Sequence, residues 1–453
     1  MKILSMAFGA SLAAALSLVA PPAAAKVDAA EAAKLGTTLT PVGAEKAANK
    51  AGTIPAWAPA PQSGSLKSEF STDPKIEAEA SKFTINKANM AQYAAGLTEG
   101  HKFLLKSYDT YKMNVYPTHR NVSWPQEIYD ATKENATTCE MIGTDILDNC
   151  KVGFPFPIPK SGSEPVWNHK LKWRGASVIR YNNQMIVQPS GEFQLTKIIE
   201  NVQFSYASLK KAVPLTKTSG EFLKYLSQTV APPRLAGTYI LVHEKAGTGN
   251  DGRAAWLYSP GLKRIRKAPA VCCDNPYEGT DGHEFYDQVD LFNGALERYN
   301  WKLVGKKEMY VPYNGYKIAG PKIKYKDLAK PKHLNQELPR YELHRVWVVE
   351  ANLKPGLRHV FKKRVMYLDE DSWNLVAADN YDERGGLFQF QEGHLVWGSN
   401  VQATTTVPEI IYHFTSGRYF ITAAFNEDKA PDLTAKFSPD FFTAASVQKS
   451  STK

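Results

Sequence analysis

Three closely spaced β-strand patterns between residues 340 and 394 constrain the fold of this chain most strongly. The patterns cover residues 341–351, 359–368 and 373–381, and each is rich in aromatic and β-branched residues, as strands are. A Pro-Gly turn and a short acidic turn connect them. A parallel pair needs a long crossover, so such short connections make neighbouring strands antiparallel. The sequence therefore predicts an antiparallel meander.

Other segments extend the pattern over most of the chain. Further strands are predicted at 238–244, 256–258, 263–267, 407–413 and 418–425. Helices are predicted at 86–108, 128–135 and 220–228. The tail after residue 430 is expected to be loose. This mixture of elements predicts an α+β, mostly β fold.

The N-terminus has the pattern of a secretory signal peptide. Lys2 precedes an apolar run over residues 3–19, and three alanines ending at Ala25 supply an A-x-A cleavage site. The run is short for a membrane-spanning helix, which is the alternative. No later stretch reaches membrane-spanning length, so we expect cleavage after Ala25 and a soluble mature protein in the periplasm.

The chain is basic, with a formal net charge of +10 that becomes +9 without Lys2. Such a charge fits anionic lipid headgroups or an acidic partner, although it can also serve solubility alone. Nucleic acid is not expected in the periplasm. Two strands carry basic clusters, at 263–267 and 362–364, and a solvated, edge-protecting face is the simpler interpretation. The candidates for headgroup binding or docking are Arg264, Arg266, Arg340, His344, Arg345 and Arg364.

The four cysteines fall into two pairs. Cys139 and Cys150 flank a short polar segment, which predicts a disulfide loop in an oxidising compartment. Cys272 and Cys273 are adjacent and could form a vicinal disulfide, pair elsewhere or stay reduced. No C-x-x-C spacing is present, so we expect no metal site.

Catalytic motifs are absent from the sequence. The ten histidines have no zinc spacing, and no nucleophile elbow, P-loop or dinucleotide fingerprint occurs, so no cofactor is predicted. Glu342 and His344 share a strand face with Arg340, whereas Arg345 faces the other way. A salt-bridged strand face explains this group better than acid–base catalysis. A hydrolase that uses Glu342 and His344 is therefore a minor alternative.

Several sequence blocks resemble one bacterial family. They are LTPVGAEKAANKAGTIPAW, YKMNVYPTHR, GFPFPIPKSG with WNH, FNGALERYNWKLVGKKEMYVPYN, and RYELHRVWVVEANL with RHVFKKRVMYLDEDSW. Together they are similar to the family called domain of unknown function 1329, over nearly all of the mature chain. Members of that family are outer-membrane-lipoprotein-sorting-like and resemble LolA and LolB, periplasmic carriers with an incomplete barrel. The resemblance implies a curved antiparallel sheet that forms an incomplete LolA/LolB-like barrel, covered by helices and long loops.

We expect one large LolA/LolB-like domain over 26–453. Pro- and Gly-rich sequence near its start predicts an extended N-terminal wrap (26–85), and an aromatic, acidic stretch predicts a long insertion (274–335). The family resemblance implies a carrier of a lipid or other hydrophobic molecule, working with an RND-type inner-membrane transporter and an outer-membrane protein. A ligand-free adaptor between those partners is the alternative. The apolar cavity candidates, each of which could instead be ordinary core, are Trp256, Tyr258, Trp347, Phe361, Tyr367 and Trp373.

Overall fold

The fold is mostly β. The computed structural model describes residues 26–58, 73–207, 209, 213–399 and 401–451. The predicted signal peptide, residues 1–25, lies outside the described residues. Strands hold 35% of the described residues and helices 17%, which confirms the predicted α+β, mostly β class. Within the described segments, no helix combines the length and apolar character needed to cross a membrane.

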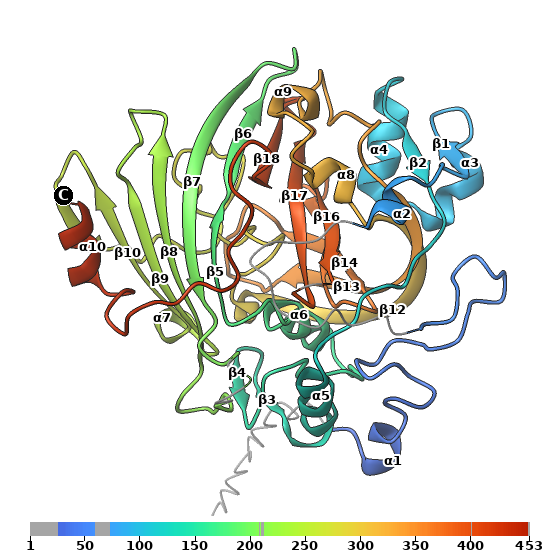
Figure 1. Cartoon of the computed structure of the whole chain (residues 1–453), viewed down its shortest axis with the longest axis horizontal. Coiled ribbons are helices and arrows are strands. Elements are labelled where there is room, and N and C mark those ends of the chain that lie inside the picture. The colour runs from blue at the N-terminus through green and yellow to red at the C-terminus, as the bar shows by residue number, and fades with distance from the viewer. Residues whose placement is uncertain (1–25, 59–72, 208, 210–212, 400, 452–453) are drawn as a thin grey trace, which may run out of the picture.

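One large sheet, strongly curved and open, organises the molecule (Figure 1). In sheet order its strands are β1 (Phe83–Ile85), β2 (Met113–Val115), β13 (Tyr341–Leu353), β14 (Lys363–Asp369), β15 (Leu375–Tyr381), β16 (Leu387–Gly398), β17 (Ala403–His413), β18 (Tyr419–Ala424), β6 (Asn183–Val187), β7 (Phe193–Gln203), β8 (Glu221–Ala231), β9 (Tyr239–Lys245), β10 (Arg253–Ser259) and β11 (Arg264–Lys267). In addition, β12 (Tyr299–Pro312) pairs with β13, and β5 (Ser177–Tyr181) pairs with β7. The first and last strands of this order do not meet, so the barrel is incomplete.

The predicted meander is confirmed. β13, β14 and β15 are sequential antiparallel neighbours, with Val349 opposite Met366 and Met366 opposite Ala378. The second strand begins at Lys363, four residues later than predicted. Among the described strands, the pairing of β2 with β13 is the parallel one.

Helices cover parts of the sheet. They are α1 (Ala29–Ala32), α2 (Pro74–Glu77), α3 (Met90–Tyr93), α4 (Glu99–Ser107), α5 (Gln126–Thr138), α6 (Ser163–Lys170), α7 (Gly249–Gly252), α8 (Tyr316–Ala319), α9 (Tyr325–Leu328) and α10 (Ala444–Ser451), with 3-10 turns at Ala94–Gly96 and Leu296–Arg298. The helix predicted at 128–135 is α5. The helix predicted at 86–108 is instead interrupted, because Thr98 starts a new helix by accepting a hydrogen bond from the His101 N–H.

Two sequence predictions of local structure are wrong, one for residues 220–228 and one for the C-terminal tail. The helix predicted at 220–228 is the strand β8, which pairs along its length with β7 and β9. Tyr225 lies opposite Val202 on one side and Val242 on the other. These long-range ladders override a local helical pattern, as tertiary context commonly does.

The tail is the second correction. It was expected to be loose after residue 430, yet Phe442 and Val447 are buried together with Tyr258 of β10. The helix α10 packs on β9, β10 and β11 at one margin of the molecule (Figure 1). The apolar side chains of the tail therefore cover the face of the sheet that β10 presents there.

The Cys139–Cys150 disulfide is present, as predicted. It closes the loop that contains a separate two-stranded sheet of β3 (Glu140–Ile142) and β4 (Ile146–Asp148). The N-terminal segment contacts the main body, where Ile54 is buried and the Val42 carbonyl accepts a hydrogen bond from the Trp373 indole. Part of the predicted insertion forms β12, which pairs antiparallel with β13. A bulge interrupts this pairing between Leu303 and Gly305.

Candidate functional site

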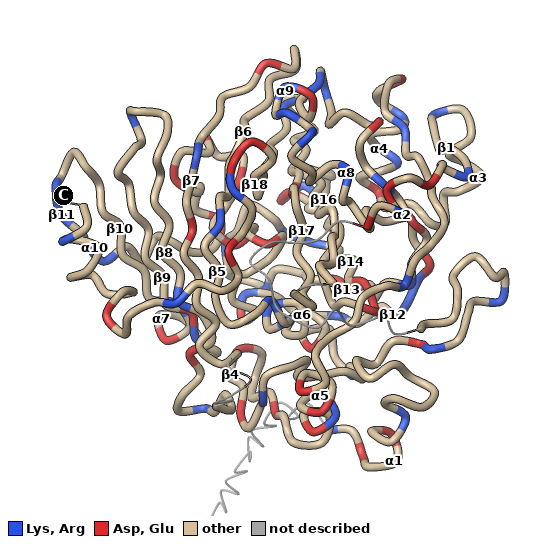
Figure 2. Tube along the Cα trace, in the orientation of Figure 1, with Lys and Arg blue, Asp and Glu red and all other residues tan. Residues whose placement is uncertain are grey.

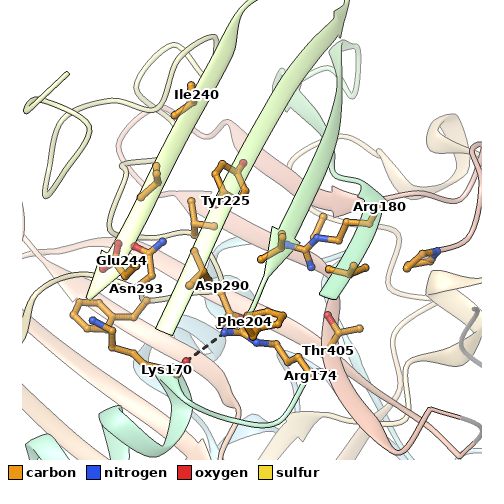
Figure 3. Close-up of a pocket in the computed structure, with 18 of the residues that line it drawn as sticks. Lys170, Arg174, Arg180, Phe204, Tyr225, Ile240, Glu244, Asp290, Asn293 and Thr405 are labelled. Atoms are coloured by element: carbon orange, nitrogen blue, oxygen red, sulfur yellow. Dashed lines mark hydrogen bonds and ion pairs between the residues drawn. The ribbon is translucent and has the colours of Figure 1, made fainter. Parts of the chain in front are cut away.

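An apolar pocket lies against the strands β5, β7, β8 and β9 (Figure 3). The strand register builds one wall. Tyr225 of β8 lies beside Val242 of β9, and in the next row Leu223, Glu244 and Arg253 follow one another across three strands. Because side chains alternate along a strand, these rows face the same side of the sheet.

The opposite wall comes from segments far away in the sequence. It includes the start of the predicted insertion and its flank, the strands β17 and β18, and the C-terminal segment around Pro431. That segment is fixed by a backbone pair in which Ile179 and Asp432 exchange hydrogen bonds. The apolar residues that line the pocket are Val178, Tyr181, Val202, Phe204, Phe222, Leu223, Tyr225, Ile240, Val242, Val271, Tyr277, Tyr286, Val289, Phe292, Val407, Ala423, Phe425, Pro431 and Leu433.

Charged side chains line parts of the same pocket, and most are paired. Arg253 donates to both carboxylate oxygens of Glu244, from Nε at 2.6 Å and Nη2 at 3.2 Å. Arg180 donates to Glu200 at 2.7 Å, and the Tyr225 hydroxyl donates to the same carboxylate. These pairs neutralise charge that would be costly to bury alone.

Asp290 is the centre of a second charged group. Its carboxylate accepts from Lys172 and Arg174, each at 2.6 Å, and the Arg174 guanidinium lies 4.8 Å from the Phe204 ring centroid. Burial would raise the pKa of Asp290, but Lys172 and Arg174 outweigh burial and hold that pKa below its usual range. Burial lowers the pKa of Lys172 to about 7. The pocket therefore combines apolar walls with a paired ionic border.

A comparison with known proteins identifies the family. Residues 84–448 match the family described as "Protein of unknown function (DUF1329)". The chain belongs to the DUF1329 family. A relative from Pseudomonas aeruginosa, named "Uncharacterized protein PA3922", is 43% identical over 440 residues, which is 96% of each chain. The resemblance predicted from the sequence blocks is thus confirmed.

Solved structures show weaker similarity to this DUF1329 protein. A putative outer membrane lipoprotein-sorting protein domain from Vibrio parahaemolyticus has a TM-score of 0.43 and 15% identity, over 63% of this chain and 97% of its own. A DUF1329 family protein from Desulfovibrio piger has a TM-score of 0.42 and 12% identity, over 60% of this chain and 92% of its own. Such scores and identities carry no information on function.

The six aromatic cavity candidates do not line this pocket. On β10, Trp256 and Tyr258 lie opposite Leu241 and Tyr239, on the sheet face that the tail covers. Of the other four, Tyr367 and Trp373 belong to the main core, and Trp347 packs against it, stacked on Trp373. Phe361 is buried against Phe285. The Tyr367 hydroxyl donates to Asp379, and Phe361 packs against Arg364. In the DUF1329 protein the last four rings, those of Trp347, Phe361, Tyr367 and Trp373, therefore fill the interior around the meander.

Four of the six headgroup or docking candidates are also internal. Arg340, His344, Arg345 and Arg364 are buried, because both faces of β13 and β14 are covered. This corrects their assignment to a docking surface. Arg264 and Arg266, in contrast, are exposed on β11 at the margin of the sheet (Figure 2).

Glu342 and His344 belong to a buried ionic network outside the pocket. Glu342 accepts from Arg340 at 2.6 Å and contacts the His344 imidazole at 3.1 Å, and the imidazole stacks on Tyr313. Arg345 faces the other way, as predicted, and donates to Glu370.

His344 also has two aspartates nearby, Asp369 and Asp371, and the possible metal-ligating atoms of the three residues lie within 4.8 Å of one another. Arg120 binds Asp371 with two nitrogens, so a guanidinium already neutralises one of the two aspartates. The geometry fits a salt-bridged strand face.

Cys272 and Cys273 are free thiols beside the pocket residue Val271. Their sulfur atoms lie 2.9 Å apart, with the Cys273 thiol donating to Cys272. This hydrogen bond lowers the pKa of Cys272 to about 7, burial opposes the shift, and the charge of Arg253 supports it. Cys272 is therefore the more acidic thiol of the pair.

We expect the alkylation rate of Cys272 by iodoacetamide to reach half its maximum near pH 7, below the roughly 8.5 of an ordinary cysteine. Peptide mass spectrometry over a pH series measures the rate at this residue. Cys273→Ala removes the donor and should move the midpoint toward the ordinary value. An unchanged midpoint in that variant would contradict the assigned hydrogen bond.

Sequence reasoning missed most of the pocket wall. The alternation of Ile240 and Val242 on the predicted strand 238–244 was a usable signal, but the neighbouring wall on β8 had been predicted as helix. The aromatic and acidic insertion was a second signal, and its residues Tyr277, Tyr286 and Asp290 do line the pocket. The remaining wall residues come together only through tertiary contacts.

Proposed function

We propose that this protein is a periplasmic carrier that binds a lipid or other hydrophobic molecule in the apolar pocket between β8, β9 and the insertion. The observation that supports this proposal is the pocket itself, a concave apolar surface with a few polar groups, which is the usual form of a small-molecule site. A ligand-free adaptor has no need of such a cavity, so the pocket favours a carrier.

The size of the pocket suggests what part of a cargo it holds. Its accessible volume is about 130 Å³. A single water molecule needs roughly 10–15 Å³ of such volume, so the pocket accepts a chain of about ten non-hydrogen atoms. We therefore propose that one acyl-like chain is bound, or the end of a longer one.

The cellular setting of the proposal comes from the sequence and the family resemblance. Cleavage after Ala25 would release the protein into the periplasm, where an RND-type transporter and an outer-membrane protein would be donor and acceptor of the cargo. The exposed Arg264 and Arg266 on β11 would then meet anionic lipid headgroups during transfer. An intact mass that starts at Lys26 and lysine-specific crosslinking to an RND-type partner test these two steps.

The pocket is tested by binding of the neutral fluorophore N-phenyl-1-naphthylamine to protein 26–453. Val242→Trp places an indole in the pocket and should weaken binding by more than about tenfold, since losing 1.4 kcal/mol of contact has that effect. Val202→Phe is a milder variant with the same expected direction. Fluorescence titration measures the dissociation constants.

The matched control is His243→Trp, which adds the same indole to the other face of β9. It should bind the fluorophore like the wild type. Circular dichroism verifies that each variant is folded. Equal binding by folded Val242→Trp and wild type would refute the pocket as the site. Failure of the wild type to bind the fluorophore, together with no hydrophobic molecule in native mass spectra of periplasmic protein, would refute the carrier function.

A further inference from the structure

Lys170 differs from the other charged residues of the pocket. It is the last residue of α6 and is 6% exposed. Its ammonium donates to the Gly294 carbonyl at 2.8 Å and lies 4.7 Å from the centroid of the Trp167 ring. An ammonium has three N–H donors, so a single carbonyl leaves donor capacity unused. Burial lowers the pKa of Lys170.

The carboxylates around Lys170 are committed to other donors. Glu244 and Asp145 attract it electrostatically, but neither forms an ion pair with it among the described residues. Glu244 is bound by two nitrogens of Arg253. Asp145 accepts from the Leu296 N–H and the Thr144 hydroxyl. Lys170 is thus a buried cation without a direct counter-ion in this part of the structure.

The charge balance of the pocket points in the same direction. Its lining contains four cationic side chains and two acidic ones, an excess of two positive charges. Including the bonded partners Lys172 and Glu200 and the nearby Asp145 gives five cationic and four acidic groups, which still leaves an excess of one positive charge. Buried charge is costly unless it is paired, so an anionic group entering here would be stabilised.

The apolar wall leads away from Lys170. In Figure 3, Ile240 lies in the upper part of the drawn strands, whereas Lys170 and Glu244 lie close to each other in the lower left. The segment from Glu244 to Ile240 spans roughly 13 Å at 3.3 Å per residue, which suits an extended chain of about ten carbons. The pocket therefore has a cationic end and an apolar end.

We propose that the cargo is an amphiphile whose anionic headgroup, a carboxylate or a phosphate, binds the Lys170 ammonium while its chain lies along β8 and β9. This inference rests on the proposed carrier function. It adds the chemical class of the cargo, and it assigns the residue that recognises the headgroup.

The test is displacement of N-phenyl-1-naphthylamine from protein 26–453 by decanoate, decyl phosphate, decanol and decylammonium. One of the two anions should bind at least roughly tenfold more tightly than decanol, as expected for a charge-assisted hydrogen bond in a buried site. Decylammonium should bind more weakly than decanol. The stronger of the two anions identifies the headgroup as a carboxylate or a phosphate.

Lys170→Met keeps the length of the side chain and removes its charge, so the ratio of anion to decanol affinity should fall toward one. Lys170→Arg keeps the charge and should retain a preference for the anion. The matched control is Lys306→Met, because Lys306 also lies over a tryptophan ring, Trp347 at 4.9 Å, but outside the pocket. It should retain the wild-type ratio.

Equal affinities of the anions and decanol for the wild type would overturn this inference while leaving the carrier function standing. An undiminished preference in folded Lys170→Met would also overturn it. If the fluorophore and all four ligands fail to bind, the carrier function itself fails.

Discussion

Replacement of Arg364 by methionine is expected to reduce the free energy of unfolding by about 3–5 kcal/mol, the usual cost of breaking a buried ion pair. Arg364 is 0% exposed, and its Nη2 donates to Asp287 at 2.5 Å. The guanidinium also lies 4.7 Å from the Phe361 ring centroid, where it makes a cation–π contact. The variant leaves the Asp287 carboxylate buried without this partner. Urea unfolding followed by tryptophan fluorescence measures the change.

The control for this prediction is Arg266→Met, which removes an exposed arginine from β11 and should change stability by no more than about 0.5 kcal/mol. A loss below 1 kcal/mol in the Arg364 variant would show that the pair contributes little to stability.

The difference in the free energy of unfolding between the Arg364→Met variant and the wild type should become smaller at low pH. Burial would raise the pKa of Asp287, but Arg364 and His359 outweigh burial and lower it. A carboxylate with a lowered pKa stabilises the fold above its unfolded pKa of about 3.9, and this stabilisation disappears as pH falls through the folded value. Unfolding curves at pH 7 and at a pH well below about 3.9 should therefore differ less between variant and wild type at the lower pH.

Trp373→Ala is the second substitution with a large expected effect, a loss of about 3–5 kcal/mol, as for other buried tryptophans. The Trp373 side chain is 0% exposed and stacks on Trp347, and its indole N–H donates to the Val42 carbonyl at 2.9 Å. The variant leaves a cavity and breaks a contact that holds the N-terminal segment. Thermal and urea unfolding measure the loss, and Trp57→Ala, at a half-buried position, should cost less.

The backbone of Trp373 allows a sharper comparison. Its φ is +57°, in the left-handed region, where residues other than glycine pay roughly 1–2 kcal/mol. Trp373→Gly should therefore be at least as stable as Trp373→Ala, although glycine is smaller and more flexible when unfolded. A clearly more stable alanine variant would argue against backbone strain at this turn.

The sequence was sufficient to predict those features of the protein that depend on residues close together in the chain. The meander followed from alternating aromatic and β-branched residues between tight turns, and the structure has it as β13, β14 and β15. The Cys139–Cys150 pair followed from its spacing and the predicted compartment. The family followed from several long blocks that match together. In each case the deciding interactions lie within one segment or its immediate neighbour.

The pocket could not be predicted in the same way, because its walls run from Lys170 to Leu433 and meet only when the sheet curves. The period of a strand defines two faces, but it does not say which distant segment covers each face. For that reason Trp256 and Tyr258 were expected in a cavity and lie instead under the C-terminal tail. Arg364 was expected at the surface and lies in the core.

The sequence by itself determined which residues form strands in the meander, which cysteines bridge, and which family the chain belongs to, since local periodicity and matching blocks decide these. The tertiary structure alone decided that β8 is a strand, that four predicted docking residues are buried, and that Lys170 faces an apolar pocket without a direct counter-ion. Strand pairing and burial depend on residues hundreds of positions apart, and no local pattern encodes them.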